Sequence, residues 1–88
     1  IIDVREQNEY SEAHIKDSIL VPLSNVSAAR INEINSENKL IIIHCRSGKR
    51  SKVAANILIS QDYQGEILEI DDGIIGWIEN NQPVISDL

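Results

Sequence analysis

The only cysteine of this 88-residue sequence stands at the head of its densest cluster of positive charge. After Cys45 come four of the eight Lys and Arg residues of the chain: Arg46, Lys49, Arg50 and Lys52. A thiolate is a far better nucleophile than a thiol, and neighbouring cations favour the thiolate. The pattern therefore predicts a reactive cysteine that attacks an anionic substrate, whereas a lone cysteine without such neighbours is usually a small buried hydrophobe.

The segments on either side of this cluster predict how it is held. Residues 39–44, KLIIIH, form a continuous apolar run that is typical of a strand buried on both faces. Residues 51–63 carry four apolar side chains on one expected helical face: Val53, Ala54, Ile57 and Leu58. The loop between them then lies at the carboxyl end of a central parallel strand, where open α/β folds hold their sites. Gly48 permits a turn there, and the free N–H groups of a helix start would form an anion-binding nest around the sulfur.

The rest of the chain alternates between strand and helix signals. Three further short strands are expected, at Ile1–Val4, at Ser18–Leu23, where Pro22 stops the run, and at Gly65–Ile70. Helical turns are expected within residues 6–14, 24–37 and 72–81. This alternation predicts an α/β fold, with a central parallel sheet and helices on both faces, in a single domain that spans residues 1–88.

Composition excludes several classes of function. The formal net charge of −6 argues against nucleic acid as a partner. One cysteine excludes an internal disulfide framework and an all-cysteine metal site. No apolar stretch approaches the roughly 20 residues that span a bilayer, so this segment is not expected to insert into a membrane. The chain opens on a strand without a Met, so we expect a domain truncated from a longer protein. We expect a cytoplasmic location, or a periplasmic or membrane-tethered one if that longer chain carries a signal or transmembrane segment.

Three stretches resemble the signatures of the rhodanese (sulfurtransferase) family, and together they cover nearly the whole chain. They are DVREQNEYSEAHIKDSILVPL at residues 3–23, the active-site loop CRSGKRS at residues 45–51, and DDGIIGWIENNQPV at residues 71–84. The sequence departs from the family pattern at Ala13, at Asp17 and Ser18, and at Asp72, none of which lies in the loop. The resemblance implies a three-layer rhodanese-like fold whose usual first helix and strand, before IDVR, are missing here.

The resemblance also implies a persulfide mechanism. Cys45 would take the outer sulfur of an anionic donor such as thiosulfate, and then pass it to cyanide, a thiol or a sulfur-acceptor protein. The substrate-binding residues would be those of the loop: Arg46, Ser47, Gly48, Lys49, Arg50 and Ser51. Among them Arg46, Lys49 or Arg50 would screen the departing sulfite. Asp3 and Arg5 would brace neighbouring loops, and no metal or organic cofactor would be needed.

Two other functions stay open at this point. A Cys-dependent phosphatase or arsenate reductase also uses a cysteine, loop amides and an arginine, but phosphatases place one more residue between Cys and Arg than the four that separate Cys45 from Arg50 here. A sulfur-relay or interaction module of a larger protein is the other possibility. We expect His14 and His44 to be structural, Trp77 to pack in the core, and the pair Asp71 and Asp72 to form a turn and helix cap.

Overall fold

The computed structural model describes residues 1–88, and its centre is a four-stranded parallel sheet with the order β2-β1-β3-β4. The strands are β1 (Ile2–Asp3), β2 (Ile19–Leu20), β3 (Ile41–His44) and β4 (Ile67–Glu69). Each neighbouring pair runs parallel, with Ile2 opposite both Ile19 and Ile43, and Ile43 opposite Glu69. The predicted parallel sheet is confirmed, although each strand is shorter than the apolar run that predicted it.

The second strand shows why the prediction ran too long. β2 ends at Leu20, and a short 3-10 helix, η1 (Leu23–Asn25), follows directly after Pro22. Proline carries no N–H, so the chain cannot continue a strand ladder through it. The prediction of a strand over Ser18–Leu23 is therefore wrong in its second half, which instead turns the chain toward the next helix.

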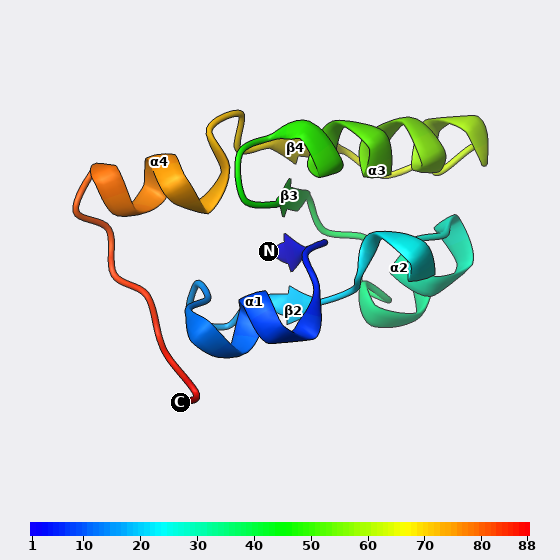
Figure 1. Cartoon of the computed structure of the whole chain (residues 1–88). Coiled ribbons are helices and arrows are strands. Elements are labelled where there is room, and N and C mark those ends of the chain that lie inside the picture. Colours follow the sequence, from blue (N-terminus) through cyan, green and yellow to red (C-terminus); the bar gives the residue numbers. More distant parts are fainter.

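Helices cover both faces of the sheet. They are α1 (Gln7–Glu12), α2 (Ala28–Ile34), α3 (Lys49–Ser60) and α4 (Gly73–Glu79). In Figure 1 the helices α2 and α3 lie on one side of the strands, and α1 and α4 lie on the other. This is the three-layer arrangement that the sequence predicted. None of these helices is long and apolar enough to span a lipid bilayer.

The core is aliphatic and lies between the sheet and α2 and α3. Ile31, Ile43 and Leu58 are each at most 1% exposed, and Ala54 packs with them. The side of α3 that faces the sheet carries Ser51, Ala54, Ala55 and Leu58. Val53, predicted on that face, is 45% exposed. The predicted face is otherwise confirmed, since Ala54 and Leu58 are buried and Ile57 packs against the core. The small residues Ser51 and Ala55 extend the buried face in place of Val53, and they allow the helix to approach the sheet closely.

The end of the chain returns to its beginning. After α4, the segment leading to Leu88 runs back toward α1, as Figure 1 shows in red. There Ile85 and His14 form an isolated antiparallel bridge, with N–H···O distances of 2.8 and 2.7 Å. The indole Nε1 of Trp77 donates to the Pro83 carbonyl at 2.8 Å, and Trp77 is only half-buried. The prediction that Trp77 packs in the core is therefore wrong: it holds this returning segment.

Candidate active site

Cys45 lies directly after β3, at the carboxyl end of a central strand, and is 1% exposed. The loop that follows is short, because α3 begins at Lys49 with Gly48 as its N-terminal cap. The Gly48 N–H points back at the sulfur and donates to Cys45 Sγ at 3.1 Å. Ser51, in the first turn of α3, places its Oγ 3.8 Å from the same sulfur. The loop and the helix start therefore enclose the thiol as the sequence predicted.

Gly48 is required by its conformation and by its surroundings. Its φ of +106° lies in a region that side chains rarely adopt, and a Cβ there would overlap the backbone carbonyl oxygen of Asp71. The segment after β4 thus packs directly against the active-site loop. A tight loop around the sulfur is possible only because Gly48 leaves room for Asp71.

A segment from the other end of the chain, Asp71–Ile75, fixes the loop from behind. The N–H of Ile74 donates to the Cys45 carbonyl at 2.9 Å, and the N–H of Ile75 donates to the Arg46 carbonyl at 3.1 Å. Gly73, with a φ of +58°, lies against the Arg46 carbonyl with no room for a Cβ. With these carbonyls held toward α4, the loop is free to present N–H groups to the sulfur. Sequence analysis missed this role, for which Gly73 in the DDG motif was the available signal.

The pKa of the Cys45 thiol lies below its ordinary value. Burial of the sulfur raises the pKa. This effect is outweighed by hydrogen bonds that lower the pKa, which come from the Ser51 N–H, the Gly48 N–H, the Ser51 hydroxyl and the Ser47 N–H. The stabilisation of the thiolate thus comes from amides and one hydroxyl that touch the sulfur. The expected anion nest is present, and the amides contribute more to the low pKa than the neighbouring cations do.

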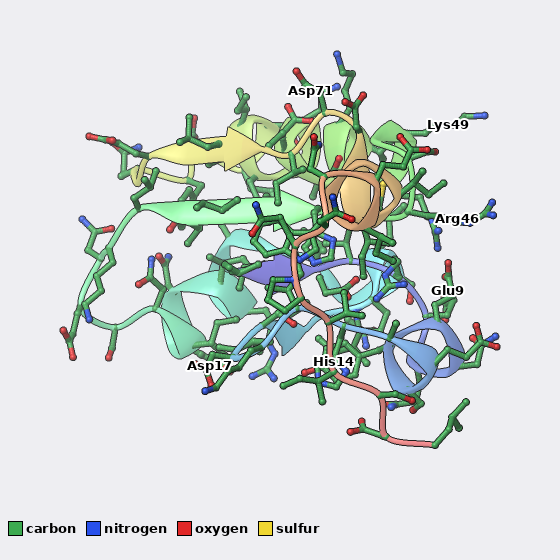
Figure 2. The ribbon with its side chains drawn as sticks, turned by 90° about the vertical axis from the view of Figure 1, so that its left-hand side faces the viewer. Glu9, His14, Asp17, Arg46, Lys49 and Asp71 are labelled. Atoms are coloured by element: carbon green, nitrogen blue, oxygen red, sulfur yellow. The ribbon has the colours of Figure 1, made fainter.

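The loop cations differ in what they contact. Arg46 and Lys49 are exposed, and they extend from the edge of the molecule where the strands end, as does Glu9 (Figure 2). Arg50 instead forms two hydrogen bonds to the Glu9 carboxylate of α1, at 2.6 and 2.9 Å. These bonds lower the pKa of Glu9 to about 2. Glu9 is a site residue that sequence analysis missed, because 41 positions separate it from Arg50.

A buried polar cluster lies beneath the loop. Arg5 donates to both oxygens of Asp3, at 3.0 and 2.8 Å, and to the Ala13 carbonyl at 2.6 Å. His44 places Nδ1 3.2 Å from the Cys45 carbonyl oxygen and Nε2 3.6 Å from the Asp3 carboxylate. Burial lowers the pKa of His44, against the opposing effect of Asp3, so the ring is neutral at pH 7. These three side chains connect β1, β3 and the end of α1 without touching the sulfur.

The other residues singled out in the sequence lie away from the thiol. His14 stacks on Tyr10 with ring centroids 3.9 Å apart, and its Nδ1 lies 2.9 Å from the Tyr10 carbonyl oxygen. Asp72 occupies the N-terminal cap position of α4, but its side chain makes no capping hydrogen bond. The predicted cap position is therefore correct, but the capping hydrogen bond expected from the side chain is absent. No three His, Cys, Asp or Glu side chains gather into a set that could hold a metal ion.

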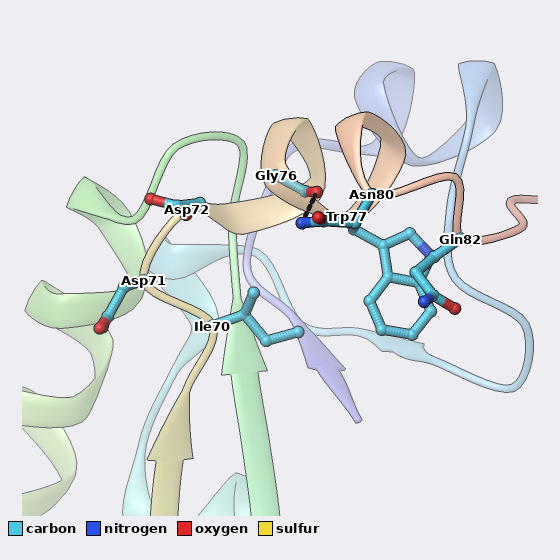
Figure 3. Close-up of a pocket in the computed structure, with 7 residues that line it drawn as sticks. All are labelled: Ile70, Asp71, Asp72, Gly76, Trp77, Asn80 and Gln82. Atoms are coloured by element: carbon cyan, nitrogen blue, oxygen red, sulfur yellow. Dashed lines mark hydrogen bonds between the residues drawn. The ribbon is translucent and has the colours of Figure 1, made fainter.

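One hollow adjoins the loop, and a second lies along α4 and the segment before it. A groove of about 240 Å³ adjoins Arg46 and is lined by three isoleucines of α4, by Ala13 and by four charged residues: Arg5, Glu9, Glu12 and Arg46. A wider hollow of about 600 Å³ lies on the other side of the Asp71–Ile75 segment. Trp77 and Gln82 lie together on one side of that hollow, and Asp71 and Asp72 lie on the other (Figure 3). The groove beside Arg46 is therefore bounded by residues of α1 and α4.

Comparison with known proteins places this geometry in context. A profile of the rhodanese-like domain matches residues 1–80. A protein of Allochromatium vinosum named as a sulfurtransferase is 31% identical over 98% of this chain and 78% of its own length. YrkF of Bacillus subtilis, which is named as a sulfur carrier protein, is 38% identical over 88% of this chain but only 40% of its own length. The crystal structure of a rhodanese-related protein from Thermoplasma volcanium superposes with a TM-score of 0.80, at 32% identity, over 96% of this chain and 80% of that one.

Proposed function

Because the chain belongs to the rhodanese-like domain family, we propose that it is a sulfurtransferase that carries a transferable sulfur as a persulfide on Cys45. The observation that carries this proposal is the buried thiol with its lowered pKa, which faces the Gly48 N–H at 3.1 Å and the Ser51 hydroxyl at 3.8 Å. A thiolate held among amide donors can attack a sulfur atom and then keep the resulting anionic persulfide in the same nest.

The reaction would proceed in two half-reactions. In the first, the Cys45 thiolate attacks the outer sulfur of thiosulfate, a new S–S bond forms, and sulfite leaves with the electron pair of the broken S–S bond. In the second, a thiophilic acceptor such as cyanide or a thiol attacks the outer persulfide sulfur, and the Cys45 thiolate is regenerated. Because the chain has no second cysteine, the acceptor is another molecule or another part of a longer protein.

The remaining residues of the loop have distinct proposed roles. Ser47, Gly48 and Ser51 contribute the donors that stabilise the sulfur anion, while Arg46 and Lys49 attract the anionic donor to the edge of the site. Asp3 and Arg5 support the strand ends below. The four residues between Cys45 and Arg50 form a smaller loop than a phosphatase uses, which suits one added sulfur atom better than a tetrahedral phosphate.

A relay role within a longer protein is a second candidate. It is favoured by YrkF, a relative named as a sulfur carrier, of which this chain spans only 40%. In that case the same Cys45 persulfide would form, but a protein thiol or carrier would accept the sulfur in place of a small molecule. The two candidates share the first half-reaction and differ in the second.

Mass spectrometry of the intact protein tests the shared intermediate. After incubation with thiosulfate or an organic persulfide, we expect the protein to gain one sulfur atom, and peptide mapping should place it on Cys45. The Cys45→Ser variant should gain nothing while it retains its fold, because the substitution is small. If no donor transfers sulfur to the wild-type protein, the proposal is wrong. Hydrolysis of an aryl phosphate that depends on Cys45 would support a phosphatase in its place.

A further inference from the structure

One cation of the active-site loop, Arg50, is already bound in an ion pair within the protein. Arg50 forms a two-pronged ion pair with Glu9, with N···O distances of 2.6 and 2.9 Å. The two side chains are only 32% and 23% exposed, so the pair is partly shielded from water. Two N–H donors of the Arg50 guanidinium are therefore used by Glu9, and they are not available to an incoming anion.

Glu9 is fixed in this position by a second contact. Its Oε1 also accepts the backbone N–H of Glu6 at 3.0 Å, which closes the capping box of α1. The hydrogen bonds from Arg50 hold the pKa of Glu9 at about 2, so the carboxylate is charged throughout the physiological range. Glu9 therefore neutralises the charge of Arg50 throughout this range.

The groove beside the loop has balanced charge and an apolar wall. Of its two arginines, Arg5 is bound to Asp3 and only Arg46 is free of an ion pair, while Glu9 and Glu12 line the same groove. Its remaining wall is apolar: Ala13, Ile74, Ile75 and Ile78. Such a surface suits a donor that bears a carbon skeleton and little net charge better than it suits a small dianion.

We infer that Glu9 is a specificity-determining residue, which by occupying Arg50 biases the site away from the dianion thiosulfate and toward organic persulfides. The inference rests on the proposed sulfur transfer and concerns which donor serves it. Because Glu9 neutralises Arg50, an incoming donor loses the attraction of that cation, and the loss is about twice as large for a donor of charge −2 as for one of charge −1 at the same distance. The apolar wall would contact the organic group of the persulfide, which thiosulfate lacks.

The chemical step is balanced for such a donor. The Cys45 thiolate attacks the outer sulfur of R–S–SH, the new S–S bond forms, and the bond between the two donor sulfurs breaks. The thiolate R–S⁻ leaves with that electron pair and takes a proton from water. The protein then carries Cys45 as a persulfide, as it would after reaction with thiosulfate, and no oxidant or reductant is needed.

The substitution Glu9→Gln tests this role. Glutamine keeps an oxygen that can accept the Glu6 N–H, but it removes the charge and releases Arg50. We expect kcat/KM for thiosulfate to rise about tenfold, through a lower KM, while kcat/KM for mercaptoethanol persulfide, which has no carboxylate, changes less than about twofold. Glu12→Gln is the matched control, because Glu12 lines the same groove without an ion pair. In this variant the donor ratio, meaning kcat/KM for thiosulfate divided by kcat/KM for the organic persulfide, should change less than about twofold.

Two further measurements, together with the Glu12→Gln control, make the outcome decisive. The gain from Glu9→Gln should vanish when Arg50→Gln is also present, since there is then no cation to release. An equal gain in Glu12→Gln would assign the effect to overall charge and overturn the inference. In the wild-type protein, the kcat/KM of mercaptoethanol persulfide should exceed that of thiosulfate after each value is divided by the rate of the same donor with free cysteine. The reverse order would also overturn the inference. If no donor transfers sulfur to Cys45 at all, the proposed function itself fails. If sulfur transfer occurs with an unchanged donor ratio in Glu9→Gln, only this inference fails.

Discussion

At the scale of single residues, Ser51 acts on the Cys45 sulfur in two ways. Its backbone N–H and its hydroxyl both lower the pKa of the thiol. The hydroxyl donates its one hydrogen to the Gly48 carbonyl at 3.0 Å while it accepts from the thiol at 3.8 Å, and it can turn that hydrogen to the sulfur once the thiolate forms. Because the side chain is fully buried, its hydroxyl has no bulk water to replace the sulfur as a partner. Ser51 is therefore the side chain that links the shape of the loop to the reactivity of the thiol.

The substitution Ser51→Ala should raise the pKa of Cys45, since the backbone donors remain but the hydroxyl is lost. We expect the rate of alkylation by iodoacetamide at pH 7 to fall about threefold or more, and its midpoint on the pH axis to move upward. Ser47→Ala is the matched control, because Ser47 acts through its backbone N–H and its side chain is exposed. Equal effects in both variants would contradict this assignment.

The residue scale also shows what the sequence could not reveal. The predicted low pKa of Cys45 is confirmed, although the hydrogen-bond donors of the loop lower it more than the four neighbouring cations do. The position of Gly48 correctly indicated a tight loop. The partner of Arg50 could not be found in the same way, because Glu9 belongs to a helix on the other face of the sheet from α3. Spacing along the chain predicts contacts within an element, whereas this pair depends on how two elements meet.

At the scale of elements, the important part of the short helix α4 is its first turn, which contacts the loop after Cys45. Its first N–H groups donate to the Cys45 and Arg46 carbonyls, so the start of α4 helps to set the conformation of the active-site loop although it lies far from that loop in the sequence. The sequence predicted this helix, but it could not show that its N–H groups serve another segment. The strand and helix types were mostly predictable from apolar patterns. So was most of the inward face of α3, where Ala54 and Leu58 are buried, but the pattern included the exposed Val53 and missed the small buried residues Ser51 and Ala55.

The substitution Gly73→Ala tests this coupling of elements. A Cβ at Gly73 would overlap the Arg46 carbonyl, and its φ of +58° disfavours alanine. We expect a loss of about 1–3 kcal/mol in the free energy of unfolding, measured with urea, and a slower formation of the Cys45 persulfide. Asp72→Ala is the control, because Asp72 is exposed and makes no capping hydrogen bond, so it should change neither quantity appreciably. Wild-type persulfide formation in Gly73→Ala would show that the loop does not depend on this segment.

At the scale of the whole molecule, the Glu9–Arg50 pair joins the helix layers across the end of the sheet, and so it links active-site charge to stability. The pKa of Glu9 falls from 4.5 to about 2 on folding, so the pair stabilises the fold fully above pH 4.5. That stabilisation is lost as the pH falls from 4.5 toward 2. Because the pair is partly exposed, solvent screening keeps its contribution modest.

Thermal unfolding measured between pH 2 and pH 6 tests this link. The wild-type Tm should fall over the lower part of this range by about 2–5 °C more than the Tm of Glu9→Gln, which has no carboxylate to protonate at this position. Glu12→Gln should follow the wild-type curve, since Glu12 forms no ion pair. Parallel curves for the wild type and Glu9→Gln would show that the pair contributes nothing to the fold.

The near-complete burial of Cys45, at 1% exposure, also bears on how the protein survives oxidising conditions. Two sulfur atoms must approach to about 2.05 Å to form a disulfide, and a sulfur at the base of a closed loop cannot meet its counterpart in a second molecule. Air oxidation should therefore not produce a disulfide-linked dimer. Peroxide is small enough to enter the loop, so it should still oxidise the thiol. The enclosure of Cys45 should thus protect the protein from covalent cross-linking at high concentration.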